Sequence, residues 1–270
     1  MVDANDNDLE SKDKERIEEA VTAIAASDYL TAKKLLISII NNAPEDYSYT
    51  TEAEDGSLTI RFWNQAEFLH YVTWQKPSQS IYWKVGVYPR AFFYLGFIAV
   101  AEGNFEKAIH YLDRGAELEP TNPKFRLEKA QALIRNRDYS AALKLLNQNT
   151  TVGPHIDGKD VAAALRGKGS ALIELQELLE AEAAFRESLE LDPDSKVAQN
   201  ELNYISQLRG GRKADTNFQT TTSSTNSTNT CTSCGNTVTN GTVIQVKGSP
   251  VMVCDACKDK LTKKSWQFWR

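Results

Sequence analysis

Apolar residues recur at helical spacing through most of the first 210 residues. Between Pro89 and Pro120, two such runs lie on either side of the polar triplet Glu-Gly-Asn at 102–104. Residues three and four apart share one face of a helix, so each run predicts an amphipathic helix with a single apolar face. We therefore expect two helices joined by a short turn in this part of the chain.

The same arrangement returns along the chain. If Pro89 is position one, the next unit begins 34 residues later at Pro123, a third begins at about Ala162, and an earlier one covers 13–46. Small residues recur where two helices would cross closely, glycine where the first helix ends, and proline where the second ends. These positions hold Gly96, Gly103, Ala108, Pro120, Ala130, Ala142, Gly169, Ala181 and Pro193.

This pattern resembles the tetratricopeptide repeat (TPR), a helix–turn–helix unit of 34 residues. The resemblance implies a mainly α fold: a helical solenoid of four units that ends in a cap helix at about 195–208. Arg137 replaces the turn glycine of the unit that begins at Pro123, so that unit is degenerate. An unrelated helical bundle would explain the apolar faces, but not the 34-residue spacing of the small residues.

An aromatic-rich insertion, residues 47–88, interrupts the repeats. Alternating residues on either side of Asp55-Gly56 predict a β-hairpin, and Asn64 followed by Glu67 three residues later predicts the start of a helix. Residues 47–97 contain 14 of the chain's 25 aromatic residues. These side chains either line a binding surface or bury the hairpin against the solenoid, and we favour the second interpretation.

The remaining boundaries follow from composition. We expect a disordered N-terminus at 1–12, the first TPR-like unit at 13–46 and, after the insertion, three TPR units with the cap helix at 89–208. Residues 209–230 are rich in Thr, Ser and Asn without periodicity, which predicts a flexible linker. A small C-terminal domain then covers 231–270.

All four cysteines lie in this last segment, as two Cys-x2-Cys pairs separated by 19 residues: Cys231, Cys234, Cys254 and Cys257. Two such pairs complete a tetrahedral site for one structural Zn2+. The intervening runs TVIQV and VMV predict strands joined by a KGSP turn, and a helix is expected after Cys254. Residues 231–270 are therefore predicted to form a treble-clef or ribbon-like zinc finger. Two disulfides are the alternative, which a reducing compartment disfavours.

The same segment resembles the zinc-binding domain of ClpX-type bacterial unfoldases. The shared features are Cys-x2-Cys-Gly at the opening and a Gly-x-Pro turn before Cys-Asp-Ala-Cys. That resemblance implies a finger that dimerises and holds adaptor and substrate proteins. No ATPase module accompanies it in this sequence, so the resemblance covers the finger alone.

The sequence shows no catalytic constellation, and we expect a protein that is not an enzyme. Residues 153–160 match the Gly-x4-Gly-Lys spacing of a phosphate-binding loop, but Asp160 replaces the Ser or Thr that would bind magnesium. No strand precedes this motif, so we interpret it as a loop between repeats. His70, His110 and His155 lack a paired spacing and are expected to be packing or surface residues.

Charge separates the two parts of the chain. Residues 1–210 carry a formal charge of −10 and residues 231–270 carry +4. The N-terminus is polar and acidic, unlike a signal peptide, and the most apolar run, 91–101, is too short to span a bilayer. We therefore expect a cytoplasmic protein without a transmembrane segment. The lysine- and tryptophan-containing tail at 258–270 either packs on the finger, which we favour, or contacts nucleic acid or a membrane.

In the TPR family, the first helix of each unit lines a concave face. The corresponding positions hold Arg90, Phe93, Phe97, Lys124, Gln131, Arg135, Arg166 and Ser170. The resemblance implies a mildly basic, partly aromatic groove for a short peptide with acidic and apolar residues. Ordinary solvated charges and core aromatics are an equal alternative. Family members that clamp a C-terminal carboxylate use Lys and Asn where this chain has Phe93 and Phe97, so that mode is not expected.

These observations predict an adaptor for protein–protein interaction. The solenoid would recruit one protein or peptide, and the zinc finger would recruit a second partner or associate with another copy of the chain. The alternative is a nucleic-acid-binding regulator that acts through the basic finger.

Overall fold

The computed structural model describes the backbone of residues 4–211, 242–246 and 249–253, and the side chains of residues 10–209. The chain divides into two compact units, Met1–Ser206 and Gln207–Arg270. Each unit is described by itself.

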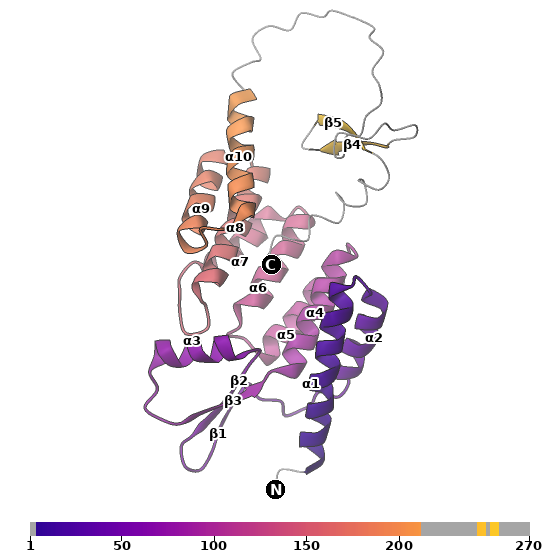
Figure 1. Cartoon of the computed structure of the whole chain (residues 1–270), viewed down its shortest axis with the longest axis vertical. Coiled ribbons are helices and arrows are strands. Elements are labelled where there is room, and N and C mark those ends of the chain that lie inside the picture. The colour runs from indigo at the N-terminus through magenta and orange to yellow at the C-terminus, as the bar shows by residue number, and fades with distance from the viewer. Residues whose placement is uncertain (1–3, 212–241, 247–248, 254–270) are drawn as a thin grey trace, which may run out of the picture. The chain divides into compact units, whose positions relative to one another are not determined.

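Helix pairs dominate the first unit (Figure 1). Each pair is joined by a three-residue turn, as expected for TPR-like units. The pairs are α1 (Ala4–Ala25) with α2 (Tyr29–Ile40), α4 (Val87–Ala101) with α5 (Phe105–Leu118), α6 (Pro123–Arg135) with α7 (Tyr139–Leu146), and α8 (Gly158–Glu174) with α9 (Leu178–Leu191). The short 3-10 helix η1 (Asn147–Asn149) follows α7, and α10 (Lys196–Gly211) follows the last pair.

Two boundaries differ from the sequence prediction. Helix α1 begins at Ala4, so residues 4–12 are helical and the prediction of disorder there is wrong. Helix α10 extends to Gly211, three residues beyond the predicted cap helix.

The turns within the four pairs share one backbone geometry. Ser27, Gly103, Arg137 and Gln176 each have a positive φ, between 62° and 76°. In each case the next residue's N–H donates to a carbonyl five residues earlier, at 2.8–2.9 Å. A left-handed residue of this kind commonly ends a helix, and glycine adopts it with least strain. The unit predicted to be degenerate therefore keeps its turn, with Arg137 in the left-handed conformation.

Close helix crossings explain two of the small residues. A Cβ atom on Gly96 would lie 2.6 Å from the Leu112 side chain, and one on Gly169 would lie 2.6 Å from the ring of Phe185. Both distances are shorter than real Cβ contacts. The predicted close approach within the α4–α5 and α8–α9 pairs is therefore confirmed.

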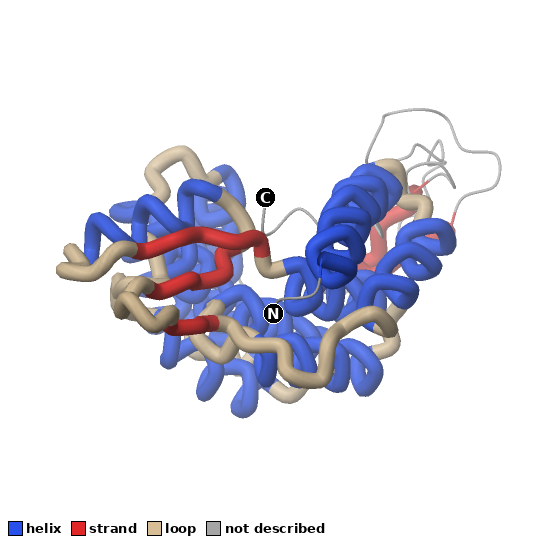
Figure 2. Tube along the Cα trace, turned by 90° about the horizontal axis from the view of Figure 1, so that it is seen from below, coloured by secondary structure: helices blue, strands red, loops and turns tan. Residues whose placement is uncertain are grey.

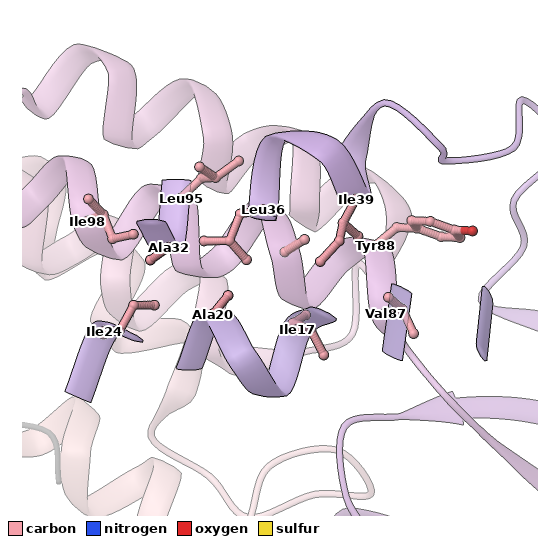
Figure 3. Close-up of a cluster of buried hydrophobic side chains, with 11 residues drawn as sticks. Ile17, Ala20, Ile24, Ala32, Leu36, Ile39, Val87, Tyr88, Leu95 and Ile98 are labelled. Atoms are coloured by element: carbon pink, nitrogen blue, oxygen red, sulfur yellow. The ribbon is translucent and has the colours of Figure 1, made fainter. Parts of the chain in front are cut away.

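The first pair shares a hydrophobic core with α4, across the insertion in sequence (Figure 3). Its labelled side chains are Ile17, Ala20, Ile24, Ala32, Leu36, Ile39, Val87, Tyr88, Leu95 and Ile98. Because α4 packs against α1 and α2 as well as α5, most of its surface is buried, which explains the apolar run at 91–101. No helix within the described ranges has the length and apolar character needed to cross a membrane.

The insertion forms a small sheet with one helix (Figure 2). Strands β1 (Thr50–Glu52) and β2 (Leu58–Phe62) make the predicted antiparallel hairpin, and Asn64 caps α3 (Gln65–Gln75) as predicted. Strand β3 (Ile81–Val85) was not predicted. It pairs in parallel with β2, and parallel pairing needs a crossover such as α3, which local alternation does not reveal.

In the second unit, β4 (Thr242–Val246) pairs antiparallel with β5 (Ser249–Val253), with Thr242 opposite Val253. The two strands were predicted, but β5 begins at Ser249, inside the segment assigned to the turn. The predicted zinc ligands Cys231, Cys234, Cys254 and Cys257 lie outside the described residues. So do residues 212–230 of the predicted linker and the tail at 258–270.

Candidate functional site

A pocket of about 240 Å³ lies where the insertion meets the α5–α6 turn and the beginning of α8. Three helices begin at its wall. Asn64, Asn122 and Asp157 cap α3, α6 and α8 by accepting backbone N–H groups at 3.1, 3.0 and 2.7 Å. Capping residues satisfy the free N–H groups of a first turn, so the starts of these three helices also bring polar side chains together here.

Glu119 is a buried carboxyl group at this pocket, only 3% exposed. Its two oxygens accept hydrogen bonds from the Trp63 indole at 2.7 Å and from the Asn122 amide at 3.0 Å. Burial raises the pKa of Glu119 to about 8 and outweighs these two donors, which act in the opposite direction. The group is therefore mostly protonated at neutral pH, and it ties the insertion to the α5–α6 turn.

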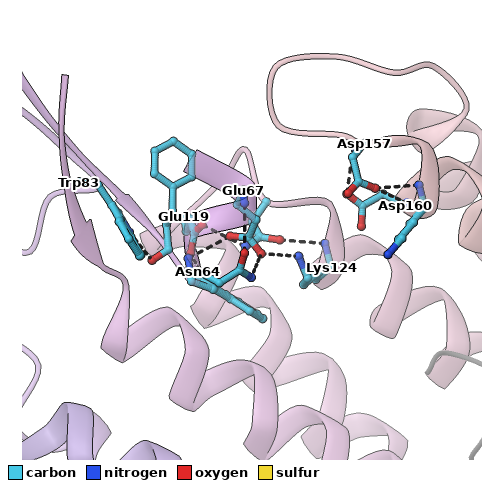
Figure 4. A network of polar contacts seen from close by, with 11 residues as sticks. Asn64, Glu67, Trp83, Glu119, Lys124, Asp157 and Asp160 are labelled. Carbon is cyan, nitrogen blue, oxygen red and sulfur yellow. Dashed lines mark hydrogen bonds and ion pairs between the residues drawn. The ribbon is translucent and has the colours of Figure 1, made fainter. Parts of the chain in front are cut away.

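A second contact joins α3 to α6 (Figure 4). The Lys124 ammonium lies 2.7 Å from the Glu67 carboxylate and 5.3 Å from the centre of the Trp63 ring. Burial disfavours the ammonium, but the surrounding carboxylates, Glu67 and Asp160 foremost, outweigh it and raise the pKa of Lys124. Lys124 thus stays charged and holds the insertion against the repeats.

The loop before α8 closes the pocket. The His70 ring nitrogen Nε2 lies 2.7 Å from the Gly153 carbonyl, and the Tyr49 hydroxyl lies 3.2 Å from Nδ1 of His155. Burial lowers the pKa of His155, whose ring packs against Phe62. Both histidines are packing residues, as predicted.

The phosphate-loop-like motif is a helix cap. The Asp157 side chain accepts from the N–H of Asp160, and the Asp160 carboxylate accepts from the N–H of Asp157. This reciprocal arrangement is a capping box. The predicted loop between repeats is therefore confirmed for residues 153–157, whereas residues 158–160 already form the first turn of α8. Within the described part of the chain, no cluster of His, Cys, Asp and Glu side chains could hold a metal ion.

The buried Glu119 predicts a pH dependence of stability. Because its pKa rises from 4.5 to about 8 on folding, its contribution to stability is fully present below pH 4.5 and is lost as pH rises through 8. We expect Glu119→Gln to lower stability by about 1 kcal/mol at pH 5.5, where one hydrogen bond is lost. That deficit should shrink or reverse at pH 9. Urea unfolding at both pH values tests this, and an equal deficit at both would contradict the assignment.

The residues predicted to form the groove have different surroundings in the structure. Phe93 packs against Trp63 of the insertion, with ring centres 5.0 Å apart, and Lys124 lies in the pocket. Two other cations are paired with carboxylates: Arg90 with Glu18 at 2.6 Å and Arg166 with Asp192 at 2.9 Å. The remaining members are Phe97, partly buried against the core of α1, α2 and α4, and the partly buried Gln131, Arg135 and Ser170.

Helix α6, which packs against both α4 and α8, keeps a stripe of polar side chains. We define this inner stripe as Lys124, Glu128, Gln131 and Arg135, which follow one another at helical spacing. Most of the other side chains of α6 are buried apolar groups, such as Phe125 and Ala130. Sequence reasoning missed Glu128. The available signal was a carboxylate on the same helical face as three predicted groove residues.

Comparisons with known proteins concern the helical repeats. Tetratricopeptide-repeat family models match residues 99–165 and 155–196. RNA polymerase II-associated protein 3 (RPAP3) of Homo sapiens is 29% identical over 112 residues, and the Mus musculus protein is 28% identical over 106. These alignments span 42% and 39% of this chain but only 16% and 15% of the relatives.

Two solved structures are similar over less than half of the chain. The first TPR domain of human RPAP3 is 25% identical, with a TM-score of 0.42, and the match covers 47% of this chain and 96% of that domain. The second TPR domain of human RPAP3, in complex with the HSP70 peptide SGPTIEEVD, is 28% identical, with a TM-score of 0.38, over 44% and 98%. The family matches and the helix pairs within them identify residues 99–196 of this chain as tetratricopeptide repeats.

Proposed function

We propose that this protein is a non-enzymatic adaptor, in which the inner faces of α4, α6 and α8 bind an extended peptide of a partner protein. The inner stripe of α6 is the main support. Helix α6 packs against both α4 and α8, and apart from this stripe it is largely apolar and buried. A polar stripe on a packed helix is expected where the surface meets solvent or a ligand.

Three predicted groove cations, Arg90, Lys124 and Arg166, are already paired with carboxylates, which argues against the acidic peptide expected from the sequence. An acidic peptide such as SGPTIEEVD, which the second RPAP3 domain binds, would compete here with Glu18, Glu67 and Asp192. Breaking an existing ion pair offsets the gain from a new one. We therefore do not propose that this chain binds an acidic peptide of that kind.

A steric variant tests the peptide site. Ser170 is half-buried on α8 and donates only to the Arg166 carbonyl, so Ser170→Tyr should fill the inner face. Peptides selected on the full chain from a random display library should bind this variant at least tenfold more weakly. Ser140→Tyr on the exposed face of α7 is the matched control and should bind normally. Equal binding to both variants, or no selected peptide at all, would exclude the site.

The second half of the proposal concerns the C-terminal unit. We propose that Cys231, Cys234, Cys254 and Cys257 hold one zinc ion and that the finger binds a second partner or another copy of the chain. Strand β5 ends at Val253, immediately before Cys254 in sequence. A two-stranded hairpin is at best marginally stable alone, and four thiolates on zinc would supply the missing folding free energy.

The charge of +4 on residues 231–270 supports a second candidate, binding of nucleic acid through the finger. Phosphate contacts by lysine depend strongly on salt. A salt-dependent shift of a labelled oligonucleotide by the full chain would favour this candidate. No shift at low salt would favour the adaptor.

A further inference from the structure

Three carboxyl groups are buried in the described part of the chain: Asp13, Glu119 and Glu128. Asp13 accepts from Asn42 at 3.0 Å and from Arg16 at 2.9 Å, and Glu119 accepts from Trp63 and Asn122. Within residues 10–209, Glu128 receives no comparable side-chain hydrogen bond. Buried polar groups almost always have partners, so an exception calls for an explanation.

Glu128 lies where a ligand bound along the inner stripe would reach it. It is 7% exposed and lies in the middle of the inner stripe, one turn after Lys124 and one turn before Gln131. Arg135, two turns further on, attracts it electrostatically. Burial raises the pKa of Glu128 to about 7 despite this attraction, so its charge is incompletely compensated.

We propose that Glu128 receives the cationic side chain of a lysine or arginine from the bound peptide. This inference rests on the proposed peptide site and names the chemistry of its ligand. A cation on a buried carboxylate makes a charge-assisted hydrogen bond, which is stronger than a neutral one. The apolar stem of a lysine or arginine can also pack along apolar surface while its charged end reaches the carboxylate.

Electrostatics of the whole unit favour the same ligand. Residues 1–210 carry a formal charge of −10, which attracts cationic rather than acidic segments at long range. At short range, an acidic side chain at Glu128 would place two carboxylates together in a buried site, which is costly. An amide could form the hydrogen bond but would leave the charge uncompensated. A basic side chain of the peptide both donates a hydrogen bond to Glu128 and compensates its negative charge.

The test uses peptides selected on the full-length protein. We expect one position of the selected peptides to be enriched in Lys or Arg. Replacing that residue with Met should weaken binding to the wild-type chain at least tenfold, but should change binding to Glu128→Gln less than twofold. Glu180→Gln, an exposed carboxylate on the outer helix α9, is the matched control and should behave like wild type.

The outcomes separate the two proposals. If selected peptides lose binding to Ser170→Tyr but show no basic residue and bind Glu128→Gln normally, the role of Glu128 is wrong and the peptide site stands. If Ser170→Tyr and Ser140→Tyr bind the peptides equally, the peptide site itself is wrong. Glu128→Gln should melt no lower than wild type because it removes a buried charge, so misfolding cannot mimic the expected loss.

Discussion

Replacing Trp63 with alanine is expected to lower the free energy of unfolding by about 3–5 kcal/mol, the range for a large buried aromatic residue. Trp63 is 8% exposed and packs against Phe93 and Phe125, with ring centres 5.0 and 5.8 Å away. Its indole is also a donor to the buried Glu119. Truncation leaves both a cavity and an incompletely satisfied carboxyl group. Such a loss is a large fraction of the stability of a typical domain.

Urea unfolding of the full chain, followed by far-ultraviolet circular dichroism, measures this effect. Trp74→Ala is the matched control, because Trp74 on α3 is 50% exposed and its truncation should cost less than about 1 kcal/mol. We also expect faster proteolytic cleavage in 47–86 for Trp63→Ala. Equal losses for the two variants would show that Trp63 does not hold the insertion on the repeats.

Removal of zinc is expected to unfold the C-terminal unit and to leave the helical unit nearly unchanged. Structural zinc contributes about 10–16 kcal/mol to small fingers, more than a 40-residue unit can replace with a core. The helices of Met1–Ser206 form a compact unit of their own, with the core of α1, α2 and α4 within it. The helical circular dichroism signal should therefore survive chelation.

Elemental analysis should find one zinc per chain, and Cys254→Ser with Cys257→Ser should abolish it. Ser233→Ala, between the first two cysteines in sequence, is a control that should retain the metal. The amide signals of β4 and β5 should lose their dispersion in the chelated sample. Absence of zinc from the purified protein, or a collapse of the helical signal on chelation, would contradict this prediction.

The structure buries only part of the aromatic insertion, for which the sequence left open a binding surface or a packed attachment. Phe62 and Trp63 are buried against the repeats, as expected for residues that attach the hairpin. Trp74 and Tyr82, in contrast, are 50% and 59% exposed, and α3 has no buried residue. Burial therefore accounts for the aromatics at the end of β2 but not for those of α3 and β3.

Local chemistry in the sequence determined the helix pairs, their turns and their caps. The spacing of apolar residues, Gly103 at a left-handed turn and Asn64 before Glu67 each act within a few residues, so they can be read from the chain itself. The close crossings at Gly96 and Gly169 were also predictable, because repetition at 34 residues reveals positions that need small side chains.

Only the tertiary structure decided what these elements place together. Glu67 meets Lys124 across 57 residues of sequence, and Trp63 meets Glu119 across 56. Neither pair leaves a local signal, because each residue has an ordinary role in its own segment. For the same reason, the burial of Glu128 could not be predicted from the sequence. In sequence Glu128 is one more glutamate on an amphipathic helix, and only the packing of the neighbouring helices buries its carboxyl group.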